Sequence, residues 1–350
     1  MVDTYLRMLR YEIRGATSSD ETELITLAAF LNTVNLPHDR EHVRALLEHS
    51  EKSYRGELGK SHRKYVFLLR DLERNCAVGT SMIIAQLGRR DAPYIYLDVI
   101  GEEQYSKTLD RHFHHTLLRI GFSYQGPTEI GGLVVDPKYR SAPEHLGLLI
   151  SYVRFLYIAM HRELFRDEIL AELLPPLEPD GTSHLWEALG RRFTGMSYAE
   201  ADLLSSTDKT FIRDLFPSGD IYATLLSPEA QGVIGKVGAQ TRGVERMLRR
   251  VGFRYAERID SFDGGPHFVA PVEEISLVGT TSKRRVASLR APKPGSPRAL
   301  LGVDLDTPPY FRAVASEIEL GAEDTIAIPT TVAAHLSVAV GSLVAVLPLP

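Results

Sequence analysis

The sequence predicts an α+β fold in which a mainly antiparallel mixed sheet is flanked by helices. Segments rich in β-branched and aromatic residues at 65–70, 77–88 and 93–100 follow one another across charged turns, as antiparallel strands do. The run EIGGLVVDPKYRSAPEHLGLLISYVRF at 129–155 reads as an apolar strand, a basic loop and an amphipathic helix. We expect the strand at 129–135 to join the sheet and the helix, at 143–162, to pack across it.

Two helices are predicted ahead of these strands. Ser18 and Glu21 have the spacing of a capping box before the apolar run LITLAAFL, and a second amphipathic segment covers about residues 39–54. Beyond the central run, DEILAELL at 167–174 is typical of a strand and SHLWEALGRRF at 183–193 of a helix. On that helix the spacing of Trp186 and Phe193 indicates burial in a core.

The sequence after residue 198 predicts smaller structural units. Short helical segments follow residue 198, and QTRGVERMLRRVGFRY at 240–255 reads as a helix and then a strand. The segment APKPGSP at 291–297 has prolines that cannot continue a helix or a central strand, which indicates a linker. A β-rich tail follows it. We therefore divide the chain into a domain at 1–200, a partial second lobe at 201–290, and a linker with a β-rich segment at 291–350.

Composition excludes several classes of function. A net charge of −5 disfavours nonspecific binding to nucleic acid or to an anionic membrane surface. Cys76 is the only cysteine, so an intramolecular disulfide and a cysteine metal cluster are excluded. The polar N-terminus is not a signal peptide, and no apolar run reaches membrane-spanning length. These features predict a cytoplasmic protein.

Histidines gather at one place, His112, His114 and His115. No carboxylate or further histidine stands at a helpful ligand spacing, so we predict a polar strand or loop there and no metal site.

The strand, loop and helix at 129–155 can hold a phosphorylated ligand, because a helix N-terminus offers unpaired N–H groups and the positive end of its dipole. The surrounding sequence is more specific. Four collinear strings resemble the arginine N-succinyltransferase family, whose members share the GNAT fold of acyl-CoA N-acyltransferases: GELGKSHRKYVFLL (56–69), LWEALGRRFTGMSYAEAD (185–202), AQGVIGKV (230–237) and GFRYAERIDSFDGGP (252–266).

The resemblance implies a GNAT-like acyl-CoA-binding domain at 1–200 and a partial second acyltransferase-like lobe at 201–290. It also implies transfer of succinyl from succinyl-CoA, a cosubstrate, to the α-amino group of L-arginine in arginine breakdown, with no permanently bound cofactor. In the family, the position of Leu133 contacts the acyl-CoA, so we expect the amides of Leu133, Val134 and Val135 to bind the thioester. Composition alone allows the alternative that all three belong to a core.

The phosphate-binding loop departs from the family pattern. Where the family has R-x-x-G-x-G, this chain keeps only Arg140 and Gly147. Pro143 has no backbone N–H to donate to a phosphate, and Glu144 adds negative charge. We therefore expect Arg140 to neutralise more of the charge of the pyrophosphate. Pro143 is also suited to the first position of the following helix, where its missing N–H costs nothing.

The resemblance also implies that the family's catalytic histidine is replaced here by Gly238. His267 is our first substitute, because histidine titrates near neutral pH and can act as acid or base. Glu172 and Glu129 are next, since burial can raise the pKa of a carboxyl group into a useful range. The alternatives are a solvated turn histidine for His267 and a hydrogen-bonded strand-end glutamate for Glu172 and Glu129. If another group serves in this way, Gly238→His should preserve or raise turnover.

Recognition of arginine needs carboxylates for the guanidinium. Asp202, Asp260 and Asp263 lie in family-like strings and are candidates, with surface or turn acids as the alternative. Two further functions stay open: an N-acyltransferase with another donor or amine, and a non-catalytic partner subunit of a hetero-oligomeric succinyltransferase. In every case we expect small-molecule substrates and a possible homo- or hetero-oligomer.

Overall fold

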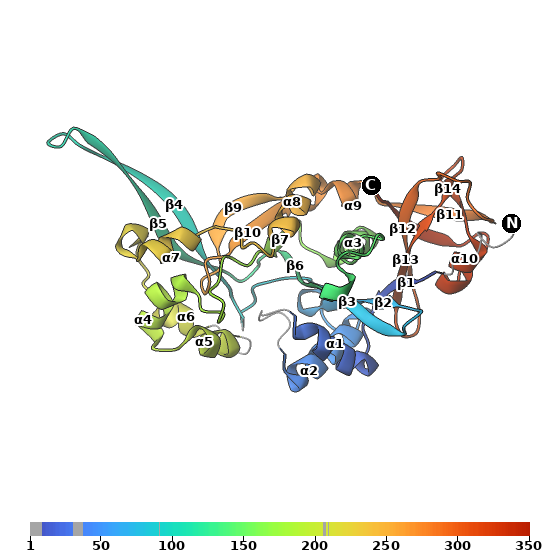
Figure 1. Cartoon of the computed structure of the whole chain (residues 1–350), viewed down its shortest axis with the longest axis horizontal. Coiled ribbons are helices and arrows are strands. Elements are labelled where there is room, and N and C mark those ends of the chain that lie inside the picture. The colour runs from blue at the N-terminus through green and yellow to red at the C-terminus, as the bar shows by residue number, and fades with distance from the viewer. Residues whose placement is uncertain (1–8, 31–37, 91, 206–207, 209) are drawn as a thin grey trace. The chain divides into compact units, whose positions relative to one another are not determined.

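The computed structural model describes residues 9–30, 38–90, 92–205, 208 and 210–350 (Figure 1). The chain forms two compact units. Unit 1 comprises Met1–Ala85, Ile130–Phe165 and Ile275–Pro350, and unit 2 comprises Gln86–Glu129 and Arg166–Glu274. The chain passes between the units more than once. The boundary predicted near residue 200 falls inside unit 2, and the one near residue 290 falls inside unit 1.

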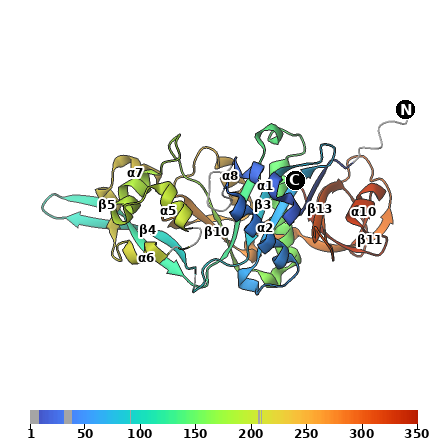
Figure 2. The same cartoon turned by 90° about the horizontal axis from the view of Figure 1, so that it is seen from below.

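The centre of unit 1 is a sheet with helices on both faces. Its strands are β1 (Tyr11–Gly15), β2 (Lys64–Asp71), β3 (Cys76–Ile84) and β6 (Thr128–Val135), adjacent in that order. On one face lie α1 (Glu21–Ala28) and α2 (Arg40–Tyr54), which can be followed in Figure 2. They bury a shared apolar core with the sheet: Leu24, Leu27, Val43, Leu47, Val66, Leu68, Met82 and Val134.

The opposite face carries α3 (Leu146–Met160), the long helix predicted at 143–162. Ser81, which alternates with the core residue Met82 along β3, donates to the carbonyl of Ile150 at 2.8 Å. The helix starts later than expected. His145, at φ 56°, is its N-cap, so Pro143 is not the first helical residue.

The N-terminal segment also differs from expectation. Residues 11–15 form strand β1, which the polar sequence YEIRG does not indicate. The capping box is made by Thr17 and Asp20 instead of Ser18 and Glu21. Asp20 accepts from the Thr17 amide at 2.8 Å and from the Arg14 guanidinium at 2.6 Å. These contacts hold the turn one residue before the predicted position.

The C-terminal β-rich segment is confirmed as part of unit 1. Its strands run in the order β14-β15-β11-β16-β12-β13-β1. The proline segment at 291–297 was predicted to be a linker. It connects β11 to β12, two strands of the same sheet that are separated by β16. The elements are β11 (Ser282–Leu289), β12 (Arg298–Asp304), β13 (Phe311–Glu317), β14 (Glu319–Leu320), β15 (Thr325–Ile328), α10 (Thr330–Leu336) and β16 (Leu343–Pro348).

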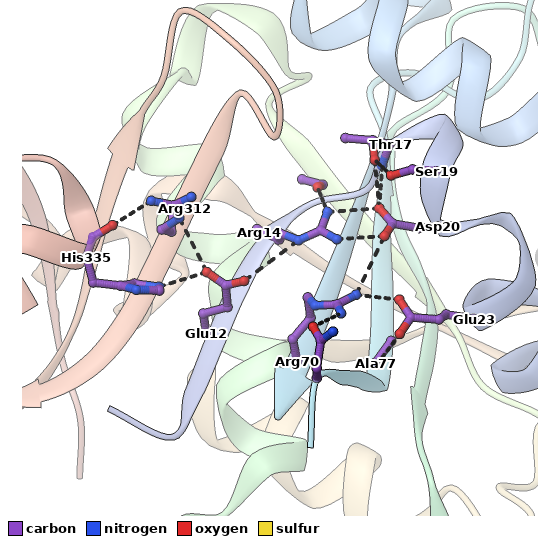
Figure 3. A network of polar contacts seen from close by, with 12 residues as sticks. Glu12, Arg14, Thr17, Ser19, Asp20, Glu23, Arg70, Ala77, Arg312 and His335 are labelled. Carbon is purple, nitrogen blue, oxygen red and sulfur yellow. Dashed lines mark hydrogen bonds and ion pairs between the residues drawn. The ribbon is translucent and has the colours of Figure 1, made fainter. Parts of the chain in front are cut away.

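A polar network ties β1 to this C-terminal segment (Figure 3). Glu12 on β1 accepts from His335 at 2.8 Å and pairs with Arg312 at 3.3 Å. Burial alone would raise the pKa of Glu12, but the hydrogen bond from His335 and the charges of Arg312 and Arg14 lower it overall. The carboxylate is therefore held in its charged form by partners from distant parts of the sequence.

In unit 2 the strands follow the order β7-β10-β9-β4-β5-β8, and all of these neighbours are antiparallel. The first residues of β6, Thr128 and Glu129, pair parallel to β7, so the predicted mixed but mainly antiparallel sheet is confirmed. The strands are β4 (Tyr94–Ser106), β5 (Arg111–Ser123), β7 (Glu168–Glu172), β8 (Ile221–Tyr222), β9 (Arg254–Ile259) and β10 (Pro266–Pro271).

The helices of unit 2 enclose an aromatic core. Trp186 is fully buried and stacks on Phe262 with ring centres 5.0 Å apart, as its spacing predicts. Phe193 is 44% exposed, so the prediction of burial is wrong there: the helix containing it ends at Thr194 with that side on the surface. The helices are α4 (Arg191–Thr194), α5 (Tyr198–Ser205), α6 (Thr210–Leu215), α7 (Pro228–Val233) and α8 (Arg242–Val251). A short helix α9 (Ser276–Thr280) belongs to unit 1.

Strands β4 and β5 form a hairpin whose far end extends beyond the rest of unit 2 (Figure 1). The predicted polar strand with His112, His114 and His115 is confirmed as part of β5. His112 contacts Glu103 at 2.8 Å and His115 contacts Thr224 at 3.0 Å. Among the described residues, no helix is both long and apolar enough to span a membrane.

Candidate active site

His267, the first candidate acid or base, lies on strand β10 and is fully buried. It follows the DGGP turn directly, where Gly264 has φ +82°. A glycine is required there, because an L-residue rarely adopts this conformation. The turn places His267 at the first pair of the β10–β7 ladder, opposite Glu172. The histidine is therefore a strand residue held in a fixed position, and the turn-histidine alternative is wrong.

Glu172 and Asp260 face this imidazole. The Oε1 of Glu172 is 3.5 Å from Nε2 of His267, and the Glu172 side chain is 30% exposed. Ligand-type atoms of Glu172, Asp260 and His267 all lie within 4.8 Å of one another. The carboxylate of Asp260 is oriented by the amides of Phe262 and Asp263, which donate to its Oδ1 at 2.7 and 3.1 Å. Two carboxylates beside one imidazole make this position attractive to a bound cation such as an ammonium group.

Tyr94 completes the cluster, and the sequence did not single it out. Its hydroxyl lies 2.7 Å from Nδ1 of His267. Burial raises the pKa of Tyr94, and the charges of Glu172 and Glu129 raise it further against the opposing effect of Arg258, so the phenol stays protonated. The available signal was the alternation of Tyr94 and Tyr96 in PYIYLDVI, which puts both rings on one face of β4.

Glu129, the third catalytic candidate, is only 3% exposed at the start of β6. It pairs with Leu170 of β7, two residues before Glu172. Its charge contributes to the raised pKa of Tyr94, so it belongs to the electrostatic surroundings of the cluster. A direct role in proton transfer stays a prediction.

A cavity of about 290 Å³ opens beside Tyr94. Tyr94 and Tyr96 form one wall, where the guanidinium of Arg258 lies 4.6 Å from the centre of the Tyr96 ring and 3.3 Å from Asp98. The rest of its lining comes from the loop after β5 and the start of β7: Ser123, Gln125, Gly126, Pro127, Arg166, Asp167 and Glu168. Charges of both signs line this cavity.

The three aspartates considered for arginine recognition lie close enough to interact. Burial raises the pKa of Asp263 well above its ordinary value, and the charges of Asp260 and Asp202 raise it further. Asp263 accepts from the Gly265 amide at 2.7 Å and so stabilises the turn before His267. Of the three, only Asp260 joins the cluster around the imidazole.

The strand, loop and helix predicted to bind the donor lie in unit 1. Gly132 has φ +57° in the middle of β6, which kinks the strand just before Leu133. The side chain of Val134 is in the core with α1 and α2, and Val135 is also buried, whereas Leu133 is only half-buried. The core alternative is therefore confirmed for Val134 and Val135 and not for Leu133. Binding of the thioester by the amides of Leu133, Val134 and Val135 stays a prediction.

Arg140 and Gly147 flank the loop before α3. The Nε of Arg140 donates to the carbonyl of Val135 at 3.1 Å, which anchors this exposed side chain and leaves its terminal nitrogens for other partners. Gly147 is exposed in the first turn of α3, where a Cβ would meet its nearest neighbour only at 4.0 Å. There is therefore room for a side chain at Gly147.

Gly238 is held by the segment that follows β7. Its amide donates to the carbonyl of Leu174 at 2.8 Å. A Cβ at this position would lie 2.6 Å from the carbonyl oxygen of Pro175 and 3.0 Å from that of Leu174. Both obstacles are backbone atoms, so a side chain requires the main chain to move. The expectation that Gly238→His preserves or raises turnover is therefore not supported by this geometry.

Comparison with known proteins shows similarity to one family over most of the chain. The family model described as arginine N-succinyltransferase beta subunit matches residues 11–277. An arginine N-succinyltransferase from Escherichia coli O6:K15:H31 is 35% identical over 270 residues, covering 76% of this chain and 77% of that protein, and the one from Shigella dysenteriae serotype 1 shows the same values. The solved structure of arginine/ornithine succinyltransferase subunit AI from Pseudomonas aeruginosa superposes with a TM-score of 0.83 at 26% identity, covering 97% of this chain and 99% of that one.

Proposed function

Because the chain belongs to the arginine N-succinyltransferase family, we propose that it transfers the succinyl group of succinyl-CoA to the α-amino group of L-arginine, a step of arginine breakdown. The names of its relatives contain the succinyl group and arginine, and the CoA thioester is our proposal for the donor. The observation that carries the proposal is the cluster of Tyr94, Glu172, Asp260 and His267, which has the groups that acylation of an amine requires.

The acceptor amine must lose a proton as it attacks the thioester. Glu172 and Asp260 attract the ammonium form of the amine, and Nε2 of His267 accepts its proton. For this, Nδ1 must carry a hydrogen, which it donates to the Tyr94 hydroxyl. The carboxylates then stabilise the imidazolium that forms. When the tetrahedral intermediate collapses, the carbon–sulfur bond breaks and the imidazolium returns the proton to the departing thiolate. The nitrogen of the former ammonium group releases its second proton to solvent as the amide forms.

The donor is assigned to the strand, loop and helix of unit 1. The amides of Leu133, Val134 and Val135 are the proposed donors to the thioester oxygen, on which negative charge develops in the tetrahedral intermediate. The exposed guanidinium of Arg140 and the first turn of α3, including Gly147, are the proposed ligands of the pyrophosphate. This arrangement replaces the family's glycine-rich loop by a longer one with a fixed arginine.

We also propose that Gly238 occupies the position of the family's catalytic histidine and that His267 has taken over its role. Gly238 is hydrogen-bonded to Leu174, which lies two residues after Glu172. Gly238 is therefore near the end of β7 that carries Glu172. The packing of Gly238 against backbone supports the proposal that the main chain here is built around a glycine, since no side chain fits without rearrangement.

The test is thiol release from succinyl-CoA when L-arginine is added to the purified chain alone. We expect turnover by the unmodified chain and a loss of roughly 10²–10⁴-fold in kcat for His267→Gln. His112→Gln, on the exposed hairpin, is the matched control and should retain turnover. Activity of His267→Gln equal to that of the control would exclude His267 as the acid or base.

A second candidate is a subunit role. The family description and the solved relative both carry the word subunit in their names, which favours assembly with another chain. If the purified chain binds succinyl-CoA but turns over only after addition of a second family member, the subunit reading replaces the catalytic one. A panel of acyl-CoA donors and basic amino acids, read by product mass, tests the remaining alternative of another donor or amine. The cytoplasmic location also stays a prediction.

A further inference from the structure

We propose that Glu172, Asp260 and His267 bind a divalent transition-metal ion of the Zn²⁺ type, and that the bound ion inhibits acyl transfer. Sequence spacing gave no indication of this, because the residues come from β7, the turn after β9 and β10. The binding itself is independent of the function proposed above. Only the inhibition rests on it.

The distances suit a small cation. Zinc bonds imidazole nitrogen and carboxylate oxygen at about 2.0–2.2 Å in a tetrahedron, which separates neighbouring ligand atoms by roughly 3.3 Å. The Nε2 of His267 and Oε1 of Glu172 are already 3.5 Å apart. The whole set lies within 4.8 Å, so no pair of ligand atoms has to approach by more than about 1.5 Å, and the partly exposed side chain of Glu172 can rotate.

Contacts behind the ligands hold two of them in place. A histidine ligand is usually oriented by a hydrogen bond at its other ring nitrogen, and Tyr94 makes that contact at Nδ1. Asp260 is oriented by two backbone amides, those of Phe262 and Asp263. The imidazole is therefore fixed with Nε2 toward the carboxylates, and binding requires little reorganisation of the protein.

The donor set selects the kind of ion. One imidazole and two carboxylates suit Zn²⁺ and neighbouring transition metals, whereas Mg²⁺ and Ca²⁺ favour sites made of oxygen alone. Three protein ligands leave one position of the tetrahedron for water. The pair of carboxylates balances the charge of the ion, as it is proposed to do for an ammonium group.

Inhibition is expected because the metal ion and the proton of the amine would both use the lone pair on Nε2 of His267. A metal ion on Nε2 of His267 prevents this atom from accepting a proton, and it occupies the two carboxylates that attract the amine. The ion and the acceptor amine therefore compete. A chelator should restore turnover without any change to the protein.

The experiment is calorimetric titration of Zn²⁺ into the full chain, without an affinity tag and in a non-chelating buffer. We expect one site, with at least a tenfold weaker affinity in both His267→Gln and Glu172→Gln, and no comparable heat with Mg²⁺. Because exposed histidines also bind zinc, the control changes His112, His114 and His115 together to Gln and should retain the site. Thermal unfolding of each variant verifies that it is folded, and Asp260→Asn provides an independent ligand change.

The outcomes separate the two proposals. Affinity that is unchanged in His267→Gln and Asp260→Asn, or that disappears in the triple-histidine control, overturns the metal site. Zinc binding that depends on the three ligands in a chain that shows no succinyl transfer supports the site and counts against the proposed function instead. Binding with full turnover at saturating zinc overturns the inhibition.

Discussion

The phenol of Tyr94 lies 2.7 Å from Nδ1 of His267, although the two residues are 173 positions apart in the chain. Their rings are also nearly parallel, with centres 5.8 Å apart. This contact fixes the orientation of the imidazole. Tyr94 is therefore a positioning residue for the proposed acid and base.

Tyr94→Phe should lower kcat by roughly tenfold to a hundredfold, which is the range for loss of an orienting contact. The ring remains and only the hydroxyl is removed, so we expect little change in folding. The limb of the pH profile of kcat that reports His267 should shift as well. Tyr96→Phe, on the neighbouring ring, is the control. A loss of stability with unchanged kcat and pH profile would show that the contact is only structural.

Arg140→Ala should raise KM for succinyl-CoA by about tenfold, the value of one charge-assisted contact to phosphate, and leave KM for L-arginine unchanged. The reason is that the Arg140 guanidinium, anchored on Val135, is the proposed partner of the pyrophosphate. Lys138→Ala removes a nearby exposed charge without that anchor. If both variants raise KM equally, general electrostatic attraction explains the effect and Arg140 has no specific role.

Much of the fold followed from local patterns. The apolar runs of β2 and β3 and the amphipathic residues of α2 each occur within a single element, so a short window of sequence contains the signal. Strand β1 was missed because its stability depends on distant partners. Glu12 and Arg14 are polar, and their places are set by His335, Arg312 and Asp20.

The candidate site was only partly predictable for the same reason. His267 and Glu172 were chosen by residue type, and their pairing across β10 and β7 depends on a register that no local pattern shows. Tyr94 was missed because a tyrosine in a strand is most often a core residue. Asp260 was assigned to substrate recognition, while the structure brings it to the imidazole through the turn that follows β9.

Gly238→Ala should destabilise unit 2 by about 1–3 kcal/mol, because its Cβ would lie 2.6 Å from a backbone oxygen and the main chain must shift. Gly238→His should cost at least as much, and we expect it to lose turnover. Gly243→Ala is the matched control, since the same atom meets nothing within 4 Å on helix α8. Urea unfolding compares the three. A stable, more active Gly238→His would show that the backbone adapts to a side chain at this position.

Acid should destabilise unit 1 through the network at β1 (Figure 3). The pKa values of Glu12 and Asp20 are lowered in the folded protein: burial opposes this shift, but hydrogen bonds from His335 and Arg14 and nearby positive charges exceed it. A carboxyl group with a lowered pKa contributes stability above its unfolded pKa of about 4 and loses it as pH falls through the folded value. Stability should therefore fall steadily below about pH 5.

Glu12→Gln isolates this contribution. At pH 7 the variant should be less stable by about 1.5–3 kcal/mol, the range for hydrogen bonds to a charged group, and its stability should depend less on pH between 5 and 3. Glu57→Gln breaks an exposed pair with Arg55, and it should change stability by less than about 1 kcal/mol. Urea unfolding across this pH range measures all three proteins. Parallel curves for Glu12→Gln and the unmodified chain would mean that Glu12 has the same pKa in the folded and unfolded states, so that its network contributes nothing to the acid sensitivity.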